Sequence, residues 1–205
     1  NKYFINDLFE AIKKNCAEDK KIIEGFNNPN YRNEYKMISN NPTYYEVKFS
    51  YEIPGLEEFD ESLVKGVLKD YENKIQEISY DILASKVLEE LISNREMDKY
   101  VIKIDKGLKK ARLLRLFDNK YLKEIVKILV PYEEEIKYQN LIKDYKEIGM
   151  SFIYKYDSND NVNPTMFVND MELLVNKEFI NNNLDNQISF DKMNIKLVVK
   201  NKEEE

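Results

Sequence analysis

The clearest potential for chemistry lies in segment 43–53, where apolar and polar residues alternate as in a strand. Glu46 and Lys48 are two residues apart, so a strand presents both side chains on one face. Nucleases of the PD-(D/E)xK type use such a pair, because the carboxylate binds Mg²⁺ and the ammonium group positions the attacking water. They also need an Asp on a preceding strand, and no Asp occurs between residues 20 and 45. A Mg²⁺-dependent nuclease at Glu46 and Lys48 is therefore the last of three functional hypotheses.

The acidic segment 157–161 begins like a calcium-binding loop, with Asp or Asn at the first, third and fifth positions. The match fails where it would be diagnostic. Val162 replaces the glycine that the turn requires, and Val168 replaces the bidentate glutamate. We therefore expect a polar hairpin loop between two strands here and not a metal site.

The composition excludes several classes of enzyme. The chain has no His, so it cannot form Ser-His-Asp or Cys-His catalytic sites or His-ligated zinc sites. The single Cys16 excludes cysteine-rich zinc clusters and internal disulfides, and it continues a helical apolar stripe, as a buried residue would. The five glycines lie far apart, which excludes a glycine-rich phosphate loop. We therefore expect no catalytic residues, no cofactor and no bound metal.

A basic segment, 103–127, stands out in a chain of net charge −6. It contains nine bases and three acids, and its net charge of +6 contrasts with −12 for the remainder. If the segment is helical, its first lysines share one face, which could contact phosphates or an acidic partner. The candidate contact residues are Lys103, Lys106, Lys109, Lys110, Arg112 and Arg115. This segment supports a nucleic-acid-binding regulator as the second hypothesis.

The elements that would position these residues follow from apolar spacing. Apolar residues spaced by three and four predict a helix over 6–24, and the Asn-rich segment 27–42 predicts a loop before the strand at 43–53. Helical spacing continues over about 60–94, a length that should pair with another long helix in a hairpin or with a second copy of the chain.

The middle and the end of the chain differ in period. Residues 97–111 fit a helix and, less well, a strand, whereas 131–149 predicts a helix that ends at Gly149. After Gly149 the period returns to two, residues 171–175 fit either a strand or the start of a short helix, and four further strands are expected. They are 151–156, 164–168, 187–190 and 194–199, the last two forming a hairpin. Asn runs such as 181–183 follow from A/T-rich codon usage and need no structural role.

These patterns predict an α+β fold with a helical middle built on a long helix hairpin, an N-terminal helix plus strand, and a small antiparallel C-terminal sheet. We expect one domain over 1–205, with sub-units 1–58, 59–149 and 150–205. The leading hypothesis is a non-catalytic structural or protein-interaction module from an A/T-rich bacterium or its mobile elements, binding a protein partner or itself through 60–94. No apolar stretch could span a membrane, so a cytoplasmic location is favoured over an extracytoplasmic fragment.

Overall fold

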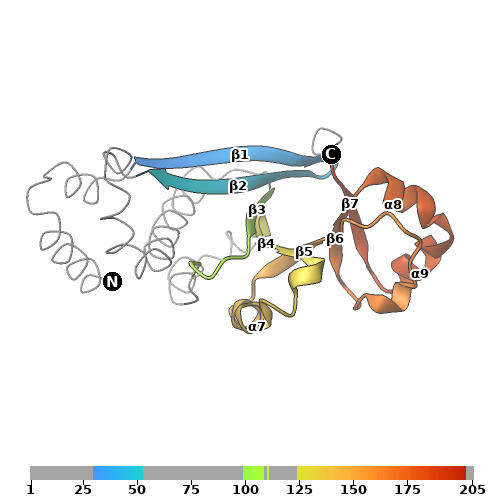
Figure 1. The fold of residues 1–205 in the computed structure, drawn as a ribbon. Helices are drawn as coiled ribbons and strands as arrows, with labels where there is room; N and C mark the ends of the chain where they lie inside the picture. The colour runs from blue at the N-terminus through green and yellow to red at the C-terminus, as the bar shows by residue number, and fades with distance from the viewer. Residues whose placement is uncertain (1–29, 53–98, 109, 111–123, 202–205) are drawn as a thin grey trace, which may run out of the picture. The chain divides into compact units, whose positions relative to one another are not determined.

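The fold is seen in a computed structural model that describes residues 30–52, 99–108, 110 and 124–201 (Figure 1). The chain divides into two compact units. Most described residues belong to the larger unit, which comprises Glu34–Lys48, Leu88–Lys106 and Lys110–Glu205. The helices predicted over 6–24 and 60–94 lie outside the described residues. The prediction of one domain with three sub-units stays a prediction.

A seven-stranded sheet organises the described residues, and its strands are neighbours in the order in which they occur in the chain. The strands are β1 (Asn30–Asn40), β2 (Thr43–Glu52), β3 (Lys99–Lys103), β4 (Val126–Pro131), β5 (Ser151–Lys155), β6 (Glu172–Val175) and β7 (Lys196–Val199). Every neighbouring pair from β2 to β7 is parallel. A two-residue turn joins β1 to β2, so this pair is a hairpin and the sheet is mixed.

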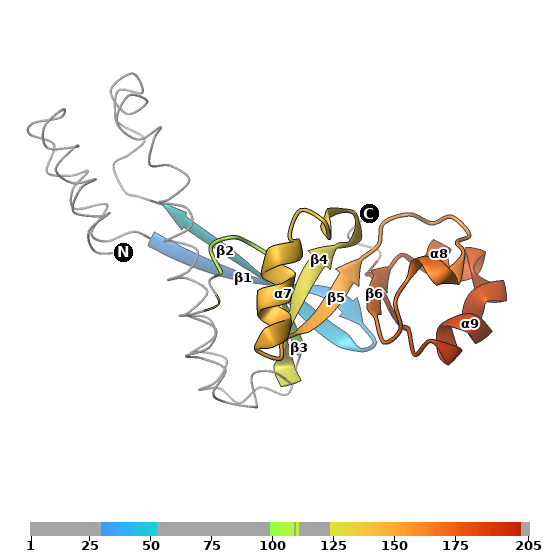
Figure 2. The ribbon, with the colours of Figure 1, turned by 90° about the horizontal axis from the view of Figure 1, so that it is seen from below.

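The sheet is curled (Figure 2), and side chains from both of its edges belong to one buried cluster. One buried apolar cluster takes a single side chain from each strand: Ile38, Tyr44, Val101, Leu129, Ile153, Leu174 and Val198. Asn201, just beyond β7, also joins the two edges of the sheet through hydrogen bonds to β1. Its backbone N–H donates to the Ile38 carbonyl at 2.9 Å, and its side-chain amide donates to the Met37 carbonyl at 3.1 Å. The result is a half-barrel with a filled inner face.

Short helices lie between the consecutive parallel strands from β4 to β7. They are η1 (Tyr132–Glu134) and α7 (Gln139–Glu147) before β5, η2 (Pro164–Met166) before β6, and α8 (Lys177–Asn182), η3 (Leu184–Asn186) and α9 (Gln187–Lys192) before β7. Tyr145 of α7 donates its hydroxyl to the Asp105 carbonyl at 3.4 Å, and the Phe179 ring of α8 lies 5.4 Å from that of Tyr156. Among the described helices, none is long and apolar enough to cross a membrane.

The predicted fold class is wrong, and so is the helical hairpin in the middle of the chain. Residues 99–103 and 126–131, within the middle of the chain that was expected to be helical, are strands β3 and β4 of the sheet. Both strands are buried on both faces, as is typical of parallel sheets, and such strands lack the alternation that identifies a half-exposed strand. The C-terminal strands belong to this same sheet and are parallel, so they do not form a small antiparallel sheet.

Several local predictions are confirmed and others are wrong. The strand at 43–53 is confirmed as β2, and the C-terminal part of the helix over 131–149 is confirmed as α7, followed by Gly149 with a φ of 85°. Strands β5 and β7 also fall where expected. In contrast, the expected loop over 27–42 contains β1, the expected strand over 164–168 contains η2, and residues 187–190 belong to α9 and not to a hairpin.

Candidate functional site

Polar side chains follow the apolar cluster toward the carboxyl ends of the parallel strands. Alternate residues of a strand share a face, so the residue two positions after each cluster member also faces the inside of the curled sheet. For the parallel strands β2 to β7 these residues are Glu46, Lys103, Pro131, Lys155, Asn176 and Lys200, of which all but Pro131 are polar. Ligands of open α/β sheets bind outside the carboxyl ends of the strands, so this edge is the candidate site.

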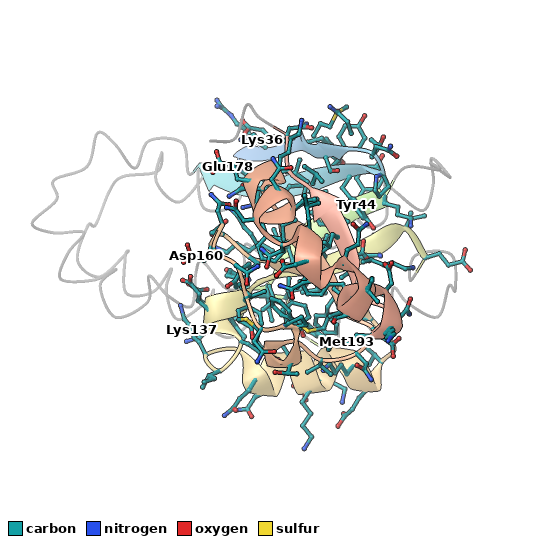
Figure 3. All side chains as sticks on the ribbon, turned by 90° about the vertical axis from the view of Figure 1, so that its right-hand side faces the viewer. Lys36, Tyr44, Lys137, Asp160, Glu178 and Met193 are labelled. Atoms are coloured by element: carbon teal, nitrogen blue, oxygen red, sulfur yellow. The ribbon has the colours of Figure 1, made fainter. Side chains whose placement is uncertain are left out.

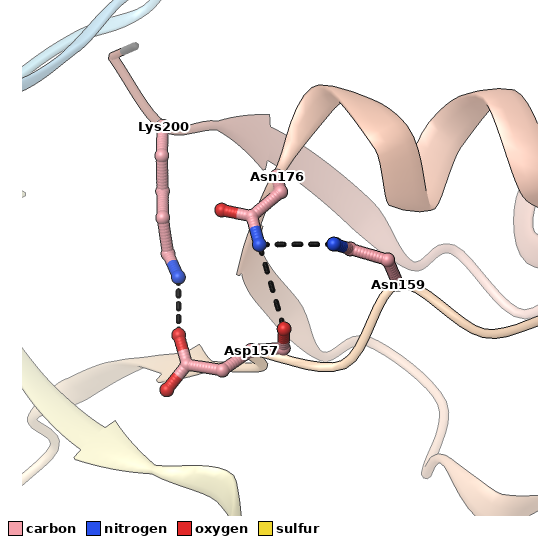
Figure 4. Close-up of polar contacts among 4 residues, drawn as sticks. All are labelled: Asp157, Asn159, Asn176 and Lys200. Carbon is pink, nitrogen blue, oxygen red and sulfur yellow. Dashed lines mark hydrogen bonds and ion pairs between the residues drawn. The ribbon is translucent and has the colours of Figure 1, made fainter. Parts of the chain in front are cut away.

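The best-defined part of this edge joins the ends of β5, β6 and β7 (Figure 4). Lys200 forms an ion pair with Asp157, two residues beyond the end of β5. The Asn176 amide nitrogen donates to the Asp157 carbonyl at 3.4 Å and to Asn159 Oδ1 at 3.0 Å. Sheet pairing continues beneath them, because Lys200 N–H donates to the Val175 carbonyl at 2.8 Å. These side chains are therefore held by the sheet itself.

Exposure differs sharply between the two members of this ion pair. The Lys200 side chain is 8% exposed, whereas that of Asp157 is 61% exposed. Lys155 lies on the inner face beside Leu174, its register partner in β6. Its side chain is half-buried and makes no ion pair with any described residue. The edge thus contains two lysines on one face, of which Lys200 is paired with a carboxylate that faces solvent.

A second polar network lies on the inner face toward the amino ends of the strands. Glu172 accepts hydrogen bonds from the Tyr44 hydroxyl and from the Lys127 ammonium group, and both charged side chains are largely buried. The ammonium groups of Lys99 and Lys127 lie 5.8 and 5.5 Å from the centre of the Tyr44 ring. Burial, and then the bond to Glu172, raises the pKa of the Tyr44 hydroxyl well above its usual range. Every member has a partner, as expected of a structural network.

Asparagines fix the loop over 157–163 against α8 and η3. Asn183 is 3% exposed, and its amide nitrogen donates to the carbonyls of Phe179 and Asp160. Asn182 donates to the Asn159 carbonyl at 2.8 Å. Asp160 and Glu178, which accepts from the Asn159 amide at 3.0 Å, are labelled in Figure 3. The prediction that the 181–183 run has no structural role is therefore wrong, and this loop is a crossover between parallel strands and not a hairpin loop.

The described members of the predicted basic set do not lie together on one helical face. Lys103 ends strand β3 and Lys106 lies in the following turn, so they do not belong to a helix. Lys110 is paired with Glu147 of α7 at 2.5 Å, and Lys127, the last base of the segment, is paired with Glu172. Lys109, Arg112 and Arg115 lie outside the described residues. Acids of the fold thus partner two bases of this segment.

Glu46 lies half-buried in β2, and Lys48 is exposed on the same strand. Within the described ranges, no three residues of the types His, Cys, Asp and Glu lie together as a metal site would need. Sequence reasoning missed Lys155, Asp157, Asn176 and Lys200 as a group, although the Lys155–Asp157 spacing is visible in the sequence. Lys200 and Asn176 join them only through the strand order.

Comparison of the chain with protein-family models, curated proteins and solved structures finds no match in any of the three. Function must therefore be argued from the residues themselves.

Proposed function

We propose that the chain is a non-catalytic protein-interaction module that binds its partner through the layer formed by η3, α9 and the loop after η2. The observation that carries this proposal is the exposure of three large apolar side chains on this layer. Val168 is 70% exposed, Leu184 is 62% exposed and Ile188 is 70% exposed. Grouped apolar side chains exposed to this extent are typical of interaction sites, whereas single ones are common on any surface.

Local geometry supports the grouping of these three residues. Leu184 begins η3 and Ile188 lies in α9, which follows η3 directly, so the two are four residues apart in one helical run and share a side. The loop that carries Val168 is anchored to the same run. The Phe167 ring lies 6.2 Å from that of Phe190, and the Asp170 N–H donates to the Met193 carbonyl at 2.9 Å.

The layer beneath these residues is rigid, which favours binding because little conformational entropy is lost when a partner docks. Phe179 and Phe190 are buried on its inner side with ring centres 6.3 Å apart. Asn186 donates to the Val162 carbonyl at 2.7 Å and ties the same run to the neighbouring loop. Apolar side chains on such a fixed support are the usual anchors of protein interfaces.

The test uses the full chain with the double substitution Leu184→Glu and Ile188→Glu. Ile136→Glu is the matched control, because Ile136 is 81% exposed and lies before α7, outside this layer. Cross-linking in the native host followed by mass spectrometry should recover a defined partner with the unmodified chain and with the control. The double variant should lose it, with at least tenfold less partner recovered. Light scattering of the purified proteins separates self-association from binding to another protein.

Two outcomes contradict the proposal. The first is equal recovery of partners with the double variant and with Ile136→Glu. The second is stoichiometric divalent metal in the purified chain together with hydrolytic activity, which would move the function to an enzyme.

A further inference from the structure

The carboxyl edge of β5, β6 and β7 lies apart from the residues that carry the proposed protein contact. We propose that Lys155 and Lys200, at this edge, form a binding site for a phosphate-bearing small molecule. The inference does not depend on the proposed interaction function. It rests on the position, burial and pairing of four side chains: Lys155, Asp157, Asn176 and Lys200.

The floor of the site is apolar and fully packed. Ile153, Leu174 and Val198 are exposed by 0, 1 and 2%, and each is followed two residues later by a residue of the site. Pairing extends past the ends of the strands, since the Tyr156 N–H donates to the Leu174 carbonyl at 3.0 Å. Sheet hydrogen bonds therefore hold the backbone that carries the polar side chains.

The charges of the site are unequal. Removing an ammonium group from water is costly unless an anion lies beside it. Lys200, 8% exposed, has the carboxylate of Asp157 as its partner. Lys155, half-buried on the same face, has no ion pair with a described residue. An anion between the two lysines would supply the missing charge.

Spacing favours a single anion that bridges both lysines. Neighbouring strands lie about 4.8 Å apart, so β5 and β7 are separated by about 10 Å through β6, and the inward curl brings their inner side chains closer. Long lysine side chains from both strands can therefore converge. Lysine binds phosphate as a point charge, and a dianion matches two ammonium groups better than a carboxylate does.

Asp157 and Asn176 have different parts in this site. The Asp157 carboxylate is 61% exposed and occupies Lys200 in the absence of a ligand, so it competes with an incoming anion. The Asn176 amide group donates its hydrogen bonds to the Asp157 carbonyl and to Asn159 Oδ1. Asn176 therefore positions the loop and does not bind the anion. Removing the negative charge of Asp157 should therefore strengthen phosphate binding.

The experiment titrates the full chain with inorganic phosphate, and with acetate as a monoanion, by calorimetry and by NMR shifts of the backbone amides. Phosphate should bind saturably and more tightly than acetate. Lys155→Gln and Lys200→Gln should each weaken phosphate binding at least tenfold, and Asp157→Asn should strengthen it several-fold. Lys196→Gln is the matched control, because Lys196 is an exposed lysine at the opposite end of β7.

The inference is overturned if the unmodified chain shows no saturable phosphate binding. It is overturned equally if Lys196→Gln weakens binding as much as Lys155→Gln, or if Asp157→Asn weakens it. Thermal unfolding of each variant without phosphate separates loss of binding from loss of fold. If Lys200→Gln fails to fold, phosphate binding by Asp157→Asn and by Lys155→Gln still tests the inference, because Asp157 is exposed and Lys155 is only half-buried. The Leu184 and Ile188 variant should bind phosphate normally, so this site and the proposed protein contact can fail separately.

Discussion

Replacing Asn183 by Ala tests whether the asparagine network holds the C-terminal layer together. Asn183 is 3% exposed and uses its whole side chain in hydrogen bonds. Its amide nitrogen donates to the carbonyls of Phe179 and Asp160 at 2.8 and 3.0 Å. Its amide oxygen accepts from the Val162 N–H at 2.9 Å and from the Asn186 amide at 3.0 Å.

The size of the effect follows from these four bonds. Each is worth about 1 kcal/mol net, and buried groups left without a partner add to the loss. Ala, unlike Asn, loses no side-chain conformational entropy on folding, which offsets about 1 kcal/mol of this loss. We therefore expect Asn183→Ala to lower the free energy of unfolding by about 3 kcal/mol. With a urea dependence of about 2 kcal/mol per molar, the midpoint of unfolding should fall by about 1.5 M.

Urea unfolding followed by circular dichroism measures the stability, and hydrogen exchange at the Val162 amide measures the local effect. Asn181→Ala is the matched control: Asn181 is exposed, its side chain makes no hydrogen bond with a described residue, and it lies in the same run of three asparagines. It should change stability by less than about 0.5 kcal/mol. If Asn183→Ala and Asn181→Ala differ by less than about 1 kcal/mol, or if the Val162 amide stays equally protected, the reasoning is refuted.

Two further predictions concern buried groups of the inner face and the core. Glu172→Gln should destabilise the fold by about 3 kcal/mol, because it leaves the buried Lys127 ammonium without a carboxylate. Adding Lys127→Met should recover most of this loss in urea unfolding, and equal stability of the single and double variants would contradict it. Burial, with the nearby Glu135, raises the pKa of Tyr154 to about 12, and the pKa values of Tyr44 and Tyr145 are raised further. Unfolded tyrosines ionise near about pH 10, so this stability is full below about pH 10 and is lost as the pH rises toward about 12. Urea midpoints measured at about pH 9 and about pH 11 should show the fall, and equal midpoints would contradict it.

The sequence identified elements whose pattern is set by local physics. In β2, the buried Val47 is followed by the exposed Lys48, which is the alternation expected of a strand, although Tyr44, on the same face as Lys48, is buried as well. The residue after Ile148 must be compatible with a positive φ, and Gly149 marks the end of α7 for that reason. Such signals depend on a few neighbouring residues and can be found without knowledge of the fold.

The strands of the parallel sheet were misassigned because burial on both faces removes the alternation. In β3, the consecutive residues Tyr100, Val101 and Ile102 are all buried, and β4 ends in an equally buried apolar run. Such runs fit one side of a helix as well as a strand. Residues 187–190 show the reverse error, since Phe190 is the buried residue of a short helix whose other side is exposed.

The candidate site could not be predicted because its members come from separate strands. Lys155 and Asp157 are close in sequence, but Asn176 and Lys200 reach them only because β6 and β7 follow β5 in spatial order. The same holds for Asn183, whose partners Asp160 and Val162 lie more than 20 residues away in the chain. Composition explains why asparagines are abundant and does not show which of them are buried.

The sequence by itself determined which chemistry this protein lacks: a chain without His, with one Cys and with scattered glycines cannot form the catalytic and metal sites that need them. It also determined where several short elements begin and end. Only the tertiary structure decided that the strands form one curled, mostly parallel sheet and that Lys200, after β7, meets Asp157, after β5, at its carboxyl edge. The physical reason is that local patterns report exposure to water, whereas strand order and side-chain pairing are set by contacts between residues distant in the chain.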